Sequence, residues 1–260
     1  MPEPVVPHAV GLDLAWGLRS PSGVAVLDAG GRLLDVCAAR SDEEVVAALT
    51  PWLPHAVVGI DAPLIVANAT GSRPAEQALG RDFRRFEAGC HPSNTGKPEF
   101  AEGTRAARVA ALLGLPLDPG PDVDPRTPRA IEVYPHAATV ALFDLPRILR
   151  YKAKPGRSLD DLRGELLRLM DLLETVVDTR DGAGAEPWAR LRQEAATTTT
   201  KAGLRRVEDP VDAVVCAHVA WLAIHEPDAL ARYGEPDTGV IVTPALPAHR
   251  RGDPTSPPGA

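Results

Sequence analysis

The alternation of apolar and polar positions predicts three short strands at the start of the chain. Residues 10–16 (VGLDLAW) place Val, Leu, Leu and Trp against Gly, Asp and Ala, which is the period of a strand. Residues 23–28 (GVAVLD) and 32–38 (RLLDVCA) show a similar pattern, and the intervening Ala29-Gly30-Gly31 predicts a tight hairpin. Ser41 or Asp42 is then expected to cap a helix that runs to about Trp52.

Residues 56–62 (AVVGIDA) form a mostly apolar run that ends at Pro63. Such continuous apolarity is typical of a strand buried on both faces of a sheet. The order strand-strand-strand-helix-strand therefore opens the chain.

The rest of the sequence predicts more helices than strands. We expect helices at 74–86, 99–113, 142–150, 158–177, 187–196 and 209–225, and strands at 130–134 and 239–243. Ser158 and Asp161 form a capping box for the fourth of these helices. The last helix is expected to begin with Asp209 as N-cap and Pro210 at the first position, because the β-branched run at 197–200 disfavours a helix.

Composition is that of an ordinary globular protein. Of the 260 residues, 44% are hydrophobic and 24% charged, which fits one α/β domain over residues 1–246 with helical insertions at about 67–128 and 144–206. Residues 247–260 are rich in proline, glycine and charge, so we expect a disordered tail. The net charge of -7 does not indicate a basic nucleic-acid-binding face, but it does not exclude a local one.

Cysteine usage and the apolar runs bear on the compartment. The three cysteines contain no CxxC pair, which argues against a structural zinc site or a disulfide framework. The first residues lack the basic and apolar regions of a signal peptide, and the longest apolar stretch, 213–224, is too short to span a bilayer. A reduced cytoplasmic location without membrane association is the expectation.

Four acidic residues occupy unusual places in the predicted elements. Asp13 lies inside an apolar strand, Asp61 ends another, Glu132 lies within the strand at 130–134, and Asp212 is one turn into the last helix. Each also has a structural interpretation: Asp61 as a loop cap, Glu132 as the partner of an arginine, and Asp212 as an acid favoured at a helix N-terminus. Asp13 is the hardest to explain in this way, because a lone buried carboxylate in a strand is costly.

Carboxylates gathered at one place suit a hard divalent cation such as Mg²⁺ or Mn²⁺. Two such ions about 3.5–4 Å apart can activate water and stabilise the leaving oxygen in phosphodiester hydrolysis. We therefore expect Asp13, Asp61, Glu132 and Asp212 to form an acidic cluster that binds divalent metal.

Four motifs carry a resemblance to a known family: GLDLAWG at 11–17, GIDAPL at 59–64, EVYP at 132–135 and DPVDA at 209–213. Together they resemble domain of unknown function 429, a family of predicted nucleases in the ribonuclease-H-like superfamily, over roughly residues 10–242. The resemblance implies a mixed five-stranded sheet flanked by helices, with the first three strands an antiparallel meander. The strands of Asp13 and Asp61 would then be neighbours, and the last helix would cross the sheet with Asp212 nearby.

The same resemblance implies roles for the acids in a divalent-metal-dependent nuclease. Asp13 would bridge both metals, Asp212 would complete the water-activating site and Asp61 would hold the leaving-group metal. Glu132 would be a further ligand or would orient the others. The sequence leaves open the choice of RNA or DNA, the mode of cutting and the oligomeric state.

Basic residues in the two insertions are candidates for phosphate contacts, namely Arg73, Arg81, Arg84 and Lys152. A simply solvated charged surface is the alternative interpretation. Trp16, after the Asp13 strand, could stack a nucleotide base, although a core or rim position is commoner. His91 and His136 could contact phosphate or move protons, although lone histidines more often serve structure.

Two other functions stay open. An actin-like ATP-binding phosphotransferase shares the strand-Asp beginning, but the segment after Asp13 lacks the small-residue phosphate turn and no P-loop motif occurs. A non-catalytic nucleic-acid-binding module would keep the same fold and acids without turnover.

Overall fold

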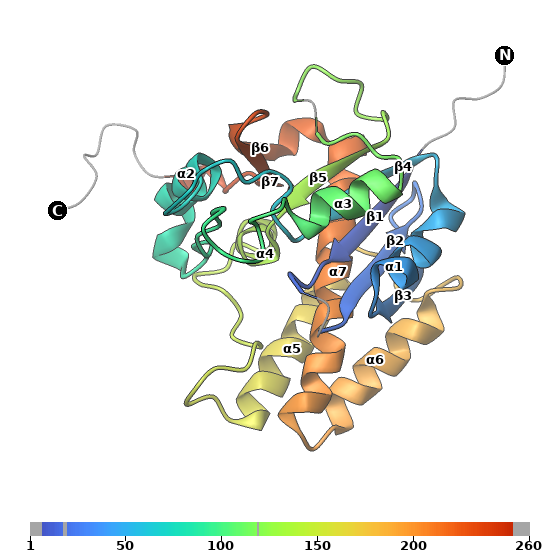
Figure 1. Cartoon of the computed structure of the whole chain (residues 1–260). Helices are drawn as coiled ribbons and strands as arrows, with labels where there is room; N and C mark the ends of the chain where they lie inside the picture. Colours follow the sequence, from blue (N-terminus) through green and yellow to red (C-terminus); the bar gives the residue numbers. More distant parts are fainter. Residues whose placement is uncertain (1–6, 18–19, 119, 252–260) are drawn as a thin grey trace, which may run out of the picture.

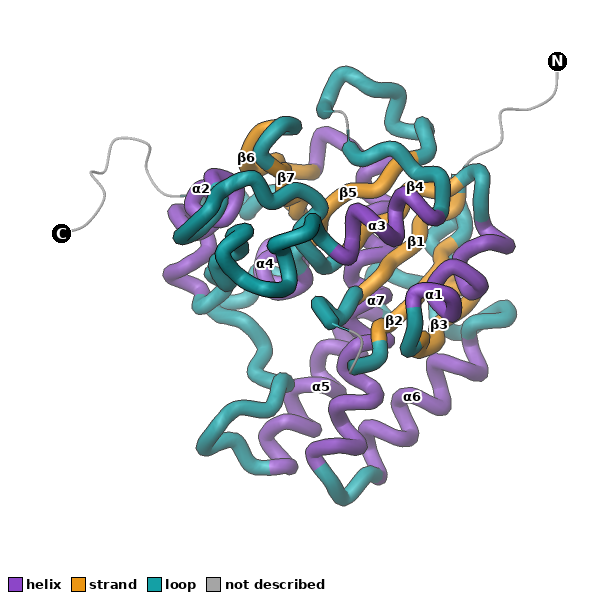
Figure 2. The backbone as a smooth tube through the Cα atoms, viewed as in Figure 1, coloured by secondary structure: helices purple, strands orange, loops and turns teal. Residues whose placement is uncertain are grey.

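The computed structural model describes residues 7–17, 20–118 and 120–251, and in this part of the chain a single mixed sheet is flanked by helices (Figures 1 and 2). The strands are β1 His8–Asp13, β2 Ser22–Leu27, β3 Leu33–Ala39, β4 Ala56–Ile60, β5 Arg129–Val133, β6 Leu230–Glu235 and β7 Gly239–Pro244. The α-helices are α1 Asp42–Leu49, α2 Pro74–Phe83, α3 Arg105–Leu112, α4 Pro135–Leu142, α5 Leu159–Leu173, α6 Ala185–Thr197 and α7 Lys201–His225.

The sheet has the strand order β3-β2-β1-β4-β5-β7-β6. As expected, β1, β2 and β3 form an antiparallel meander and β4 is a neighbour of β1. The pairing of β1 with β4 is parallel. The described sheet has seven strands, however, and not the expected five. β7 pairs with β5, and β6 (LARYGE) adds an antiparallel edge that its irregular mixture of small, charged and aromatic residues did not predict.

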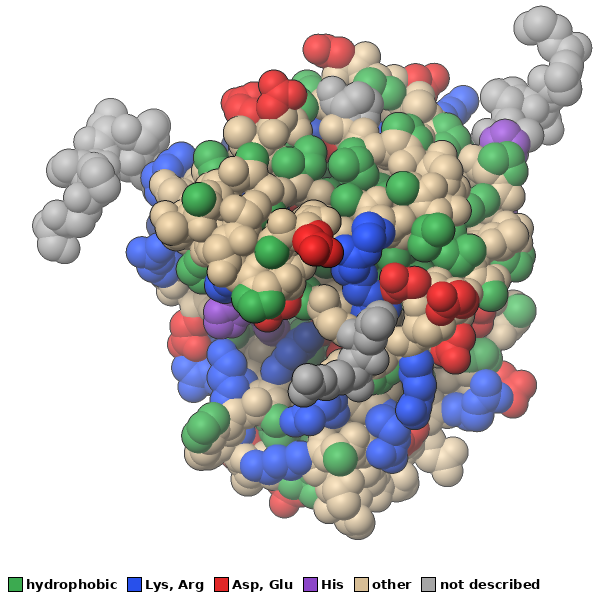
Figure 3. Space-filling model, in the orientation of Figure 1, with side chains coloured by type: hydrophobic (Ala, Val, Ile, Leu, Met, Phe, Trp, Pro, Cys, Tyr) green, Lys and Arg blue, Asp and Glu red, His purple; other side chains and the backbone are tan. Residues whose placement is uncertain are grey.

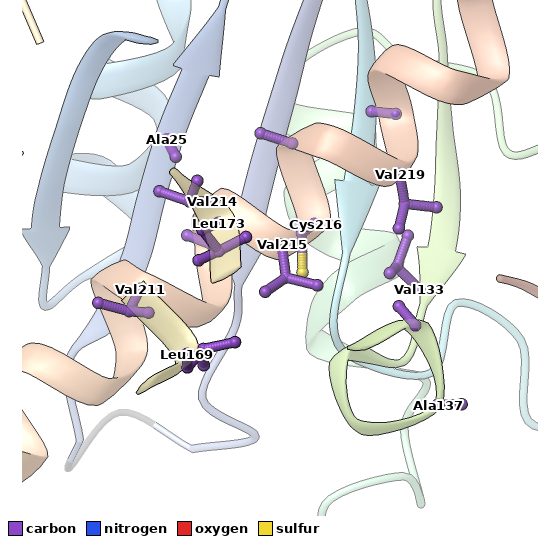
Figure 4. Packing of buried hydrophobic residues seen from close by; sticks show 14 of the residues in the cluster. Ala25, Val133, Ala137, Leu169, Leu173, Val211, Val214, Val215, Cys216 and Val219 are labelled. Atoms are coloured by element: carbon purple, nitrogen blue, oxygen red, sulfur yellow. The ribbon is translucent and has the colours of Figure 1, made fainter. Parts of the chain in front are cut away.

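Helices cover both faces of the sheet, and the side chains of each strand alternate between them. Val10 and Leu12 of β1 pack with α1 and α3. Ala9, on the same strand, belongs to the other cluster, which contains α4, α5 and α7. Figure 4 shows part of this second cluster, with Leu169 of α5 close to Val211 of α7.

Three glycines allow α7 to lie directly on the sheet. A Cβ atom built on Gly11 of β1 would be 1.9 Å from the carbonyl oxygen of Ala213, and one on Gly23 of β2 would be 1.9 Å from that of Asp209. A Cβ atom on Gly59 of β4 would be 2.6 Å from the carbonyl oxygen of Cys216. Only glycine can be accommodated at such contacts, so the glycines of three neighbouring strands allow α7 to pack directly against them.

The start of α7 corrects the sequence prediction. The helix begins at Lys201, where Thr200 is the N-cap and its side chain accepts a hydrogen bond from the backbone N–H of Gly203. Pro210 therefore lies inside the helix and Asp209 is not an N-cap. Because Asp212 is more than two turns from the N-terminus, the favourable helix-end interaction that could have explained it is absent.

The segment after β5 also differs from the prediction. Residues 135–142 form α4, whereas the expected helix at 142–150 is not formed. Pro135 suits the first helical position, and Pro146 would interrupt a helix across the later segment. The long irregular connection from 143 to 158 is consequently free to cross from α4 to α5 (Figure 1).

No helix among the described residues is long and apolar enough to cross a membrane. Of the tail expected to be disordered, residues 252–260 lie outside the described part, and residues 248–250 form a short 3-10 helix.

Candidate functional site

Asp13 and Asp61 lie side by side at the ends of two neighbouring parallel strands. Leu12 pairs with Ile60 in the register of β1 and β4, and the backbone N–H of Asp61 donates to the carbonyl oxygen of Leu12 at 2.8 Å. Asp13 lies two positions after Gly11, and Asp61 lies two positions after Gly59; both glycines contact α7. Since alternate residues of a strand share a face, both carboxylates are directed to the α7 side of the sheet.

Asp212 of α7 and Lys152 of the 143–158 connection complete the centre of the site. The Nζ atom of Lys152 lies 2.7 Å from Oδ2 of Asp212 and 3.8 Å from Oδ2 of Asp13. The hydroxyl of Tyr151 donates to Oδ1 of Asp212 at 2.6 Å. Asp212 is fully buried, so these two neighbours provide the positive charge and the hydrogen bond that its carboxylate requires.

The connection that carries Lys152 is itself held in place. The guanidinium of Arg157 donates to the carbonyl oxygen of Lys152 at 2.7 Å and to that of Arg150 at 3.3 Å. The backbone of Lys152 is therefore fixed, although a third of its side chain is exposed.

Burial and crowding raise the pKa values of the acids around this lysine. Burial, opposed by Lys152, holds the pKa of Asp13 well above its usual range and raises that of Asp61 to about 7. The same causes raise the pKa of Glu208 to about 7 and that of Asp209 to about 6. These carboxylates repel one another and are shielded from water, so the binding of a proton or a cation is favourable.

Glu208 was not singled out from the sequence. It is buried, and its Oε1 atom accepts no hydrogen bond from any described residue. Glu208 and Asp212 are four positions apart, which places both on one face of a helix. That spacing would have pointed to Glu208 if the helix had been predicted to begin at Lys201.

The Oδ2 atoms of Asp13 and Asp212 are candidate oxygen ligands for a cation. Within the described residues, neither Oδ2 of Asp13 nor that of Asp212 accepts a hydrogen bond of good geometry, although both atoms are buried. Such oxygens suit a hard cation. No three His, Cys, Asp or Glu side chains of the described chain are already arranged as a metal site, however, and the cation between Asp13 and Asp212 is the ammonium group of Lys152.

Glu132 forms a buried ion pair with Arg73. It pairs in register with Ile60, so its side chain is directed to the opposite face from Asp61. Nη1 and Nη2 of Arg73 lie 2.9 and 2.5 Å from the two carboxylate oxygens of Glu132, and the backbone N–H of Leu64 donates to the same carboxylate. Both oxygens of Glu132 thus accept hydrogen bonds from Arg73, as in the arginine-partner interpretation, and the pair lines the first cavity together with Asp13 and Asp61.

Arg73 is 1% exposed, and this burial changes its expected role as a phosphate contact. Its Nε atom donates to Glu76 at 2.8 Å and its Nη1 atom also donates to the carbonyl oxygen of Ile65. Arg73 therefore fixes the loop that follows Asp61.

Arg81 and Arg84 are exposed at the end of α2 and do not line the cavity beside the acids. α2 packs on β6 and β7, and β4, β5 and β7 separate β6 from β1. The geometry therefore does not bring these two arginines to Asp13, whereas it does bring Lys152.

A second buried arginine holds the loop after β1. Nε of Arg105 donates to Asp42 at 2.7 Å, and Nη1 donates to the carbonyl oxygens of Ala15 and Gly17 at 2.6 and 3.2 Å. Trp16, between these two residues, is 38% exposed. Arg73 and Arg105 thus have matching functions, because each fixes the loop that follows one of the acidic strands.

Two cavities open beside the acids. The first, of about 390 Å³, is lined by Asp13, Asp61, His136 and Lys152 among others. The second, of about 700 Å³, is lined by Asp13, Arg205, Glu208 and Asp209 among others. Both volumes are within the range of small-molecule sites. In Figure 3, Lys and Arg side chains gather around a hollow in this face, on the side where α5 and α7 lie.

His136 lies in the wall of the first cavity, with its ring 5.7 Å from that of Tyr151. Burial lowers its pKa to about 4, so the imidazole is neutral at pH 7. His91 lines the same cavity. The structure thus brings both histidines to the site.

The fold and the site together define a mixed α/β protein that presents buried carboxylates to cavities at one end of its central strands. The chain belongs to the family described as protein of unknown function (DUF429), whose model matches residues 11–238. This match confirms the family resemblance carried by the four motifs, all of which lie within it. Comparisons with curated proteins and with solved structures returned no match.

Proposed function

We propose that this protein is a ribonuclease-H-like nuclease that hydrolyses phosphodiester bonds of nucleic acid with Mg²⁺ or Mn²⁺. The observation that carries the proposal is the meeting of Asp13, Asp61 and Asp212, from two strands and a helix, beside one lysine and two cavities. The strand order β3-β2-β1-β4-β5 within the wider sheet supports the superfamily assignment.

The donor set fits a divalent cation. Asp13, Asp61 and Asp212 would hold it, since all three are acidic. Oδ2 of Asp13 is buried without a hydrogen bond, and Oδ2 of Asp212 has the ammonium group of Lys152 beside it. When bound, Mg²⁺ or Mn²⁺ supplies positive charge that offsets the carboxylates and makes nearby water more acidic.

The surrounding residues have distinct parts in this proposal. Tyr151 fixes Asp212 through Oδ1, and Oδ2 of Asp212 faces the ammonium group of Lys152. Lys152 neutralises Asp13 and Asp212 when no metal is present. Because its side chain is partly exposed, its ammonium group can turn from the carboxylates to a substrate phosphate.

The proposal is tested first by metal-dependent melting. The Asp13→Asn variant relieves repulsion among the acids, so without metal it should melt at a higher temperature than wild type and lose the stabilisation by Mg²⁺ or Mn²⁺. Asp122→Asn, in an exposed loop, is the matched control. A wild type that does not respond to either ion, together with a less stable Asp13→Asn variant, would refute the metal site.

The second test is cleavage of RNA, single-stranded DNA, an RNA–DNA hybrid and branched DNA in the presence of Mn²⁺. Cleavage that depends on metal and disappears in Asp13→Asn supports the nuclease. Binding without cleavage of any of these substrates would instead support the non-catalytic module.

A further inference from the structure

Trp16 is a large exposed side chain at the junction of the two cavities. Its indole is 38% exposed, and the residue lines both the first and the second cavity. Asp13, Ala15 and Lys152 are likewise common to both cavities. A ligand that occupies both cavities would therefore lie beside Trp16 and Asp13.

The ring of Trp16 is held in a defined position. Its edge contacts Phe100 with ring centroids 5.2 Å apart, and Nζ of Lys97 lies 5.8 Å from its centroid. The backbone on either side is fixed by Arg105, a buried residue that is 4% exposed. An exposed aromatic ring that needs no ordering when a ligand arrives loses little conformational entropy on binding.

We propose that Trp16 stacks an unpaired base, so that the nucleic acid taken by this site is single-stranded. This inference rests on the proposed nuclease function and narrows its substrate class. An aromatic ring gains most from a base that is not already stacked in a duplex. The cavities on both sides supply cationic side chains for the adjoining phosphates, from Lys152 and Lys154 in the first and Arg205 in the second.

The test is binding of a short fluorescein-labelled DNA single strand, an RNA of the same sequence and the corresponding DNA duplex, followed by anisotropy. Measurements in EDTA and in Ca²⁺ separate binding from cleavage. Trp16→Ala should weaken single-strand binding about tenfold, whereas Trp16→Phe should retain most of the affinity. Leu112→Ala removes another exposed apolar side chain, 63% exposed on α3 and outside both cavities, and should bind as wild type does.

The outcomes distinguish the inference from the nuclease proposal. Trp16-dependent binding of single strands without cleavage in Mn²⁺ would uphold the stacking role and refute the nuclease. Wild-type affinity in Trp16→Ala, tighter binding of the duplex, or no single-strand binding in either EDTA or Ca²⁺ would overturn the stacking role, whatever the result for cleavage.

Discussion

Lys152 lies between two buried carboxylates, at distances of 2.7 Å from Asp212 and 3.8 Å from Asp13. A buried acid is tolerated when a cation or a proton accompanies it. In the absence of metal, the accompanying cation is the ammonium group of Lys152. The same residue therefore stabilises the metal-free protein and, in the proposed metal-dependent nuclease, would compete with the metal for these carboxylates.

Replacement of Lys152 by methionine should separate these two effects. Without metal, the Lys152→Met variant should lose about 2 kcal/mol of unfolding free energy, less than for a fully buried pair because part of the lysine is exposed. Mg²⁺ should then raise its melting temperature more than that of wild type. Lys154→Met, which changes an exposed lysine of the same cavity, is the control. A smaller response to Mg²⁺ in Lys152→Met would contradict competition.

The buried carboxyl of Glu208 makes the free energy of unfolding decrease as the pH rises above 4.5. Burial raises its pKa from 4.5 to about 7, so between these values the folded protein keeps a proton that the unfolded chain has lost. Stability from this group is therefore present below pH 4.5 and is lost as the pH rises toward 7.

The Glu208→Gln variant cannot ionise, so without metal it should become more stable relative to wild type as the pH rises from 4.5 to 7. The gain should reach on the order of 1–2 kcal/mol, after allowance for solvent screening. Chemical denaturation at several pH values measures it, with the exposed Glu102→Gln as control. A difference between Glu208→Gln and wild type that does not change with pH would exclude this role.

At the scale of elements, the contact between α7 and the sheet sets the geometry of the site. Gly11, Gly23 and Gly59 face the backbone of α7 from three adjacent strands. This close approach brings Asp212 to the ends of β1 and β4, where Asp13 and Asp61 are placed by strand alternation. The site is therefore a consequence of helix-on-sheet packing.

Alanine at Gly11 should disrupt this contact. Its Cβ atom would lie 1.9 Å from the carbonyl oxygen of Ala213 and 2.3 Å from the backbone nitrogen of Ala217, and neither backbone can yield without moving the helix. We expect a loss of about 3 kcal/mol or more in unfolding free energy.

Gly164→Ala is the matched control for this prediction, because Gly164 is an exposed residue of α5 and its added Cβ would meet no neighbouring group within 4 Å. That change should stabilise the protein by about 0.5–1 kcal/mol. Equal effects of the two substitutions on urea denaturation would show that α7 does not rest on Gly11.

At the scale of the whole molecule, the sheet and the helices below it share one apolar cluster. Ala25 and Val133 of the sheet belong to the same cluster as Leu169 of α5 and Trp188 of α6. Figure 4 shows α7 between the sheet and α5 in this cluster. A continuous core of this kind favours cooperative unfolding of the chain as one unit.

Leu169→Ala should therefore weaken the whole molecule and not α5 alone. Leu169 is completely buried, so its truncation should cost about 2–5 kcal/mol. Tryptophan fluorescence and circular dichroism should report the same lowered midpoint in urea. Two separated transitions in wild type or in Leu169→Ala would show that the α5–α6 region unfolds independently of the sheet.

Much of the local structure was predictable because it depends on neighbours along the chain. Strand periodicity predicts β1 to β3 and the Gly30-Gly31 turn predicts the hairpin of β2 and β3, while the family resemblance implies their antiparallel meander. α5 begins at the Ser158 capping box as expected. α7 was predicted two turns too short, since interior Pro210 resembles a helix start when its packing is unknown.

The sequence by itself determined the family, the meander, the adjacency of the strands that carry Asp13 and Asp61, and the set of candidate acids. Only the tertiary structure decided which acids share a face: Asp13, Asp61 and Asp212 meet around Lys152, whereas Glu132 lies on the other face of the sheet and pairs with Arg73. The reason is physical. Strand periodicity is encoded locally, but ion pairing depends on register and on helix packing between segments far apart in the chain.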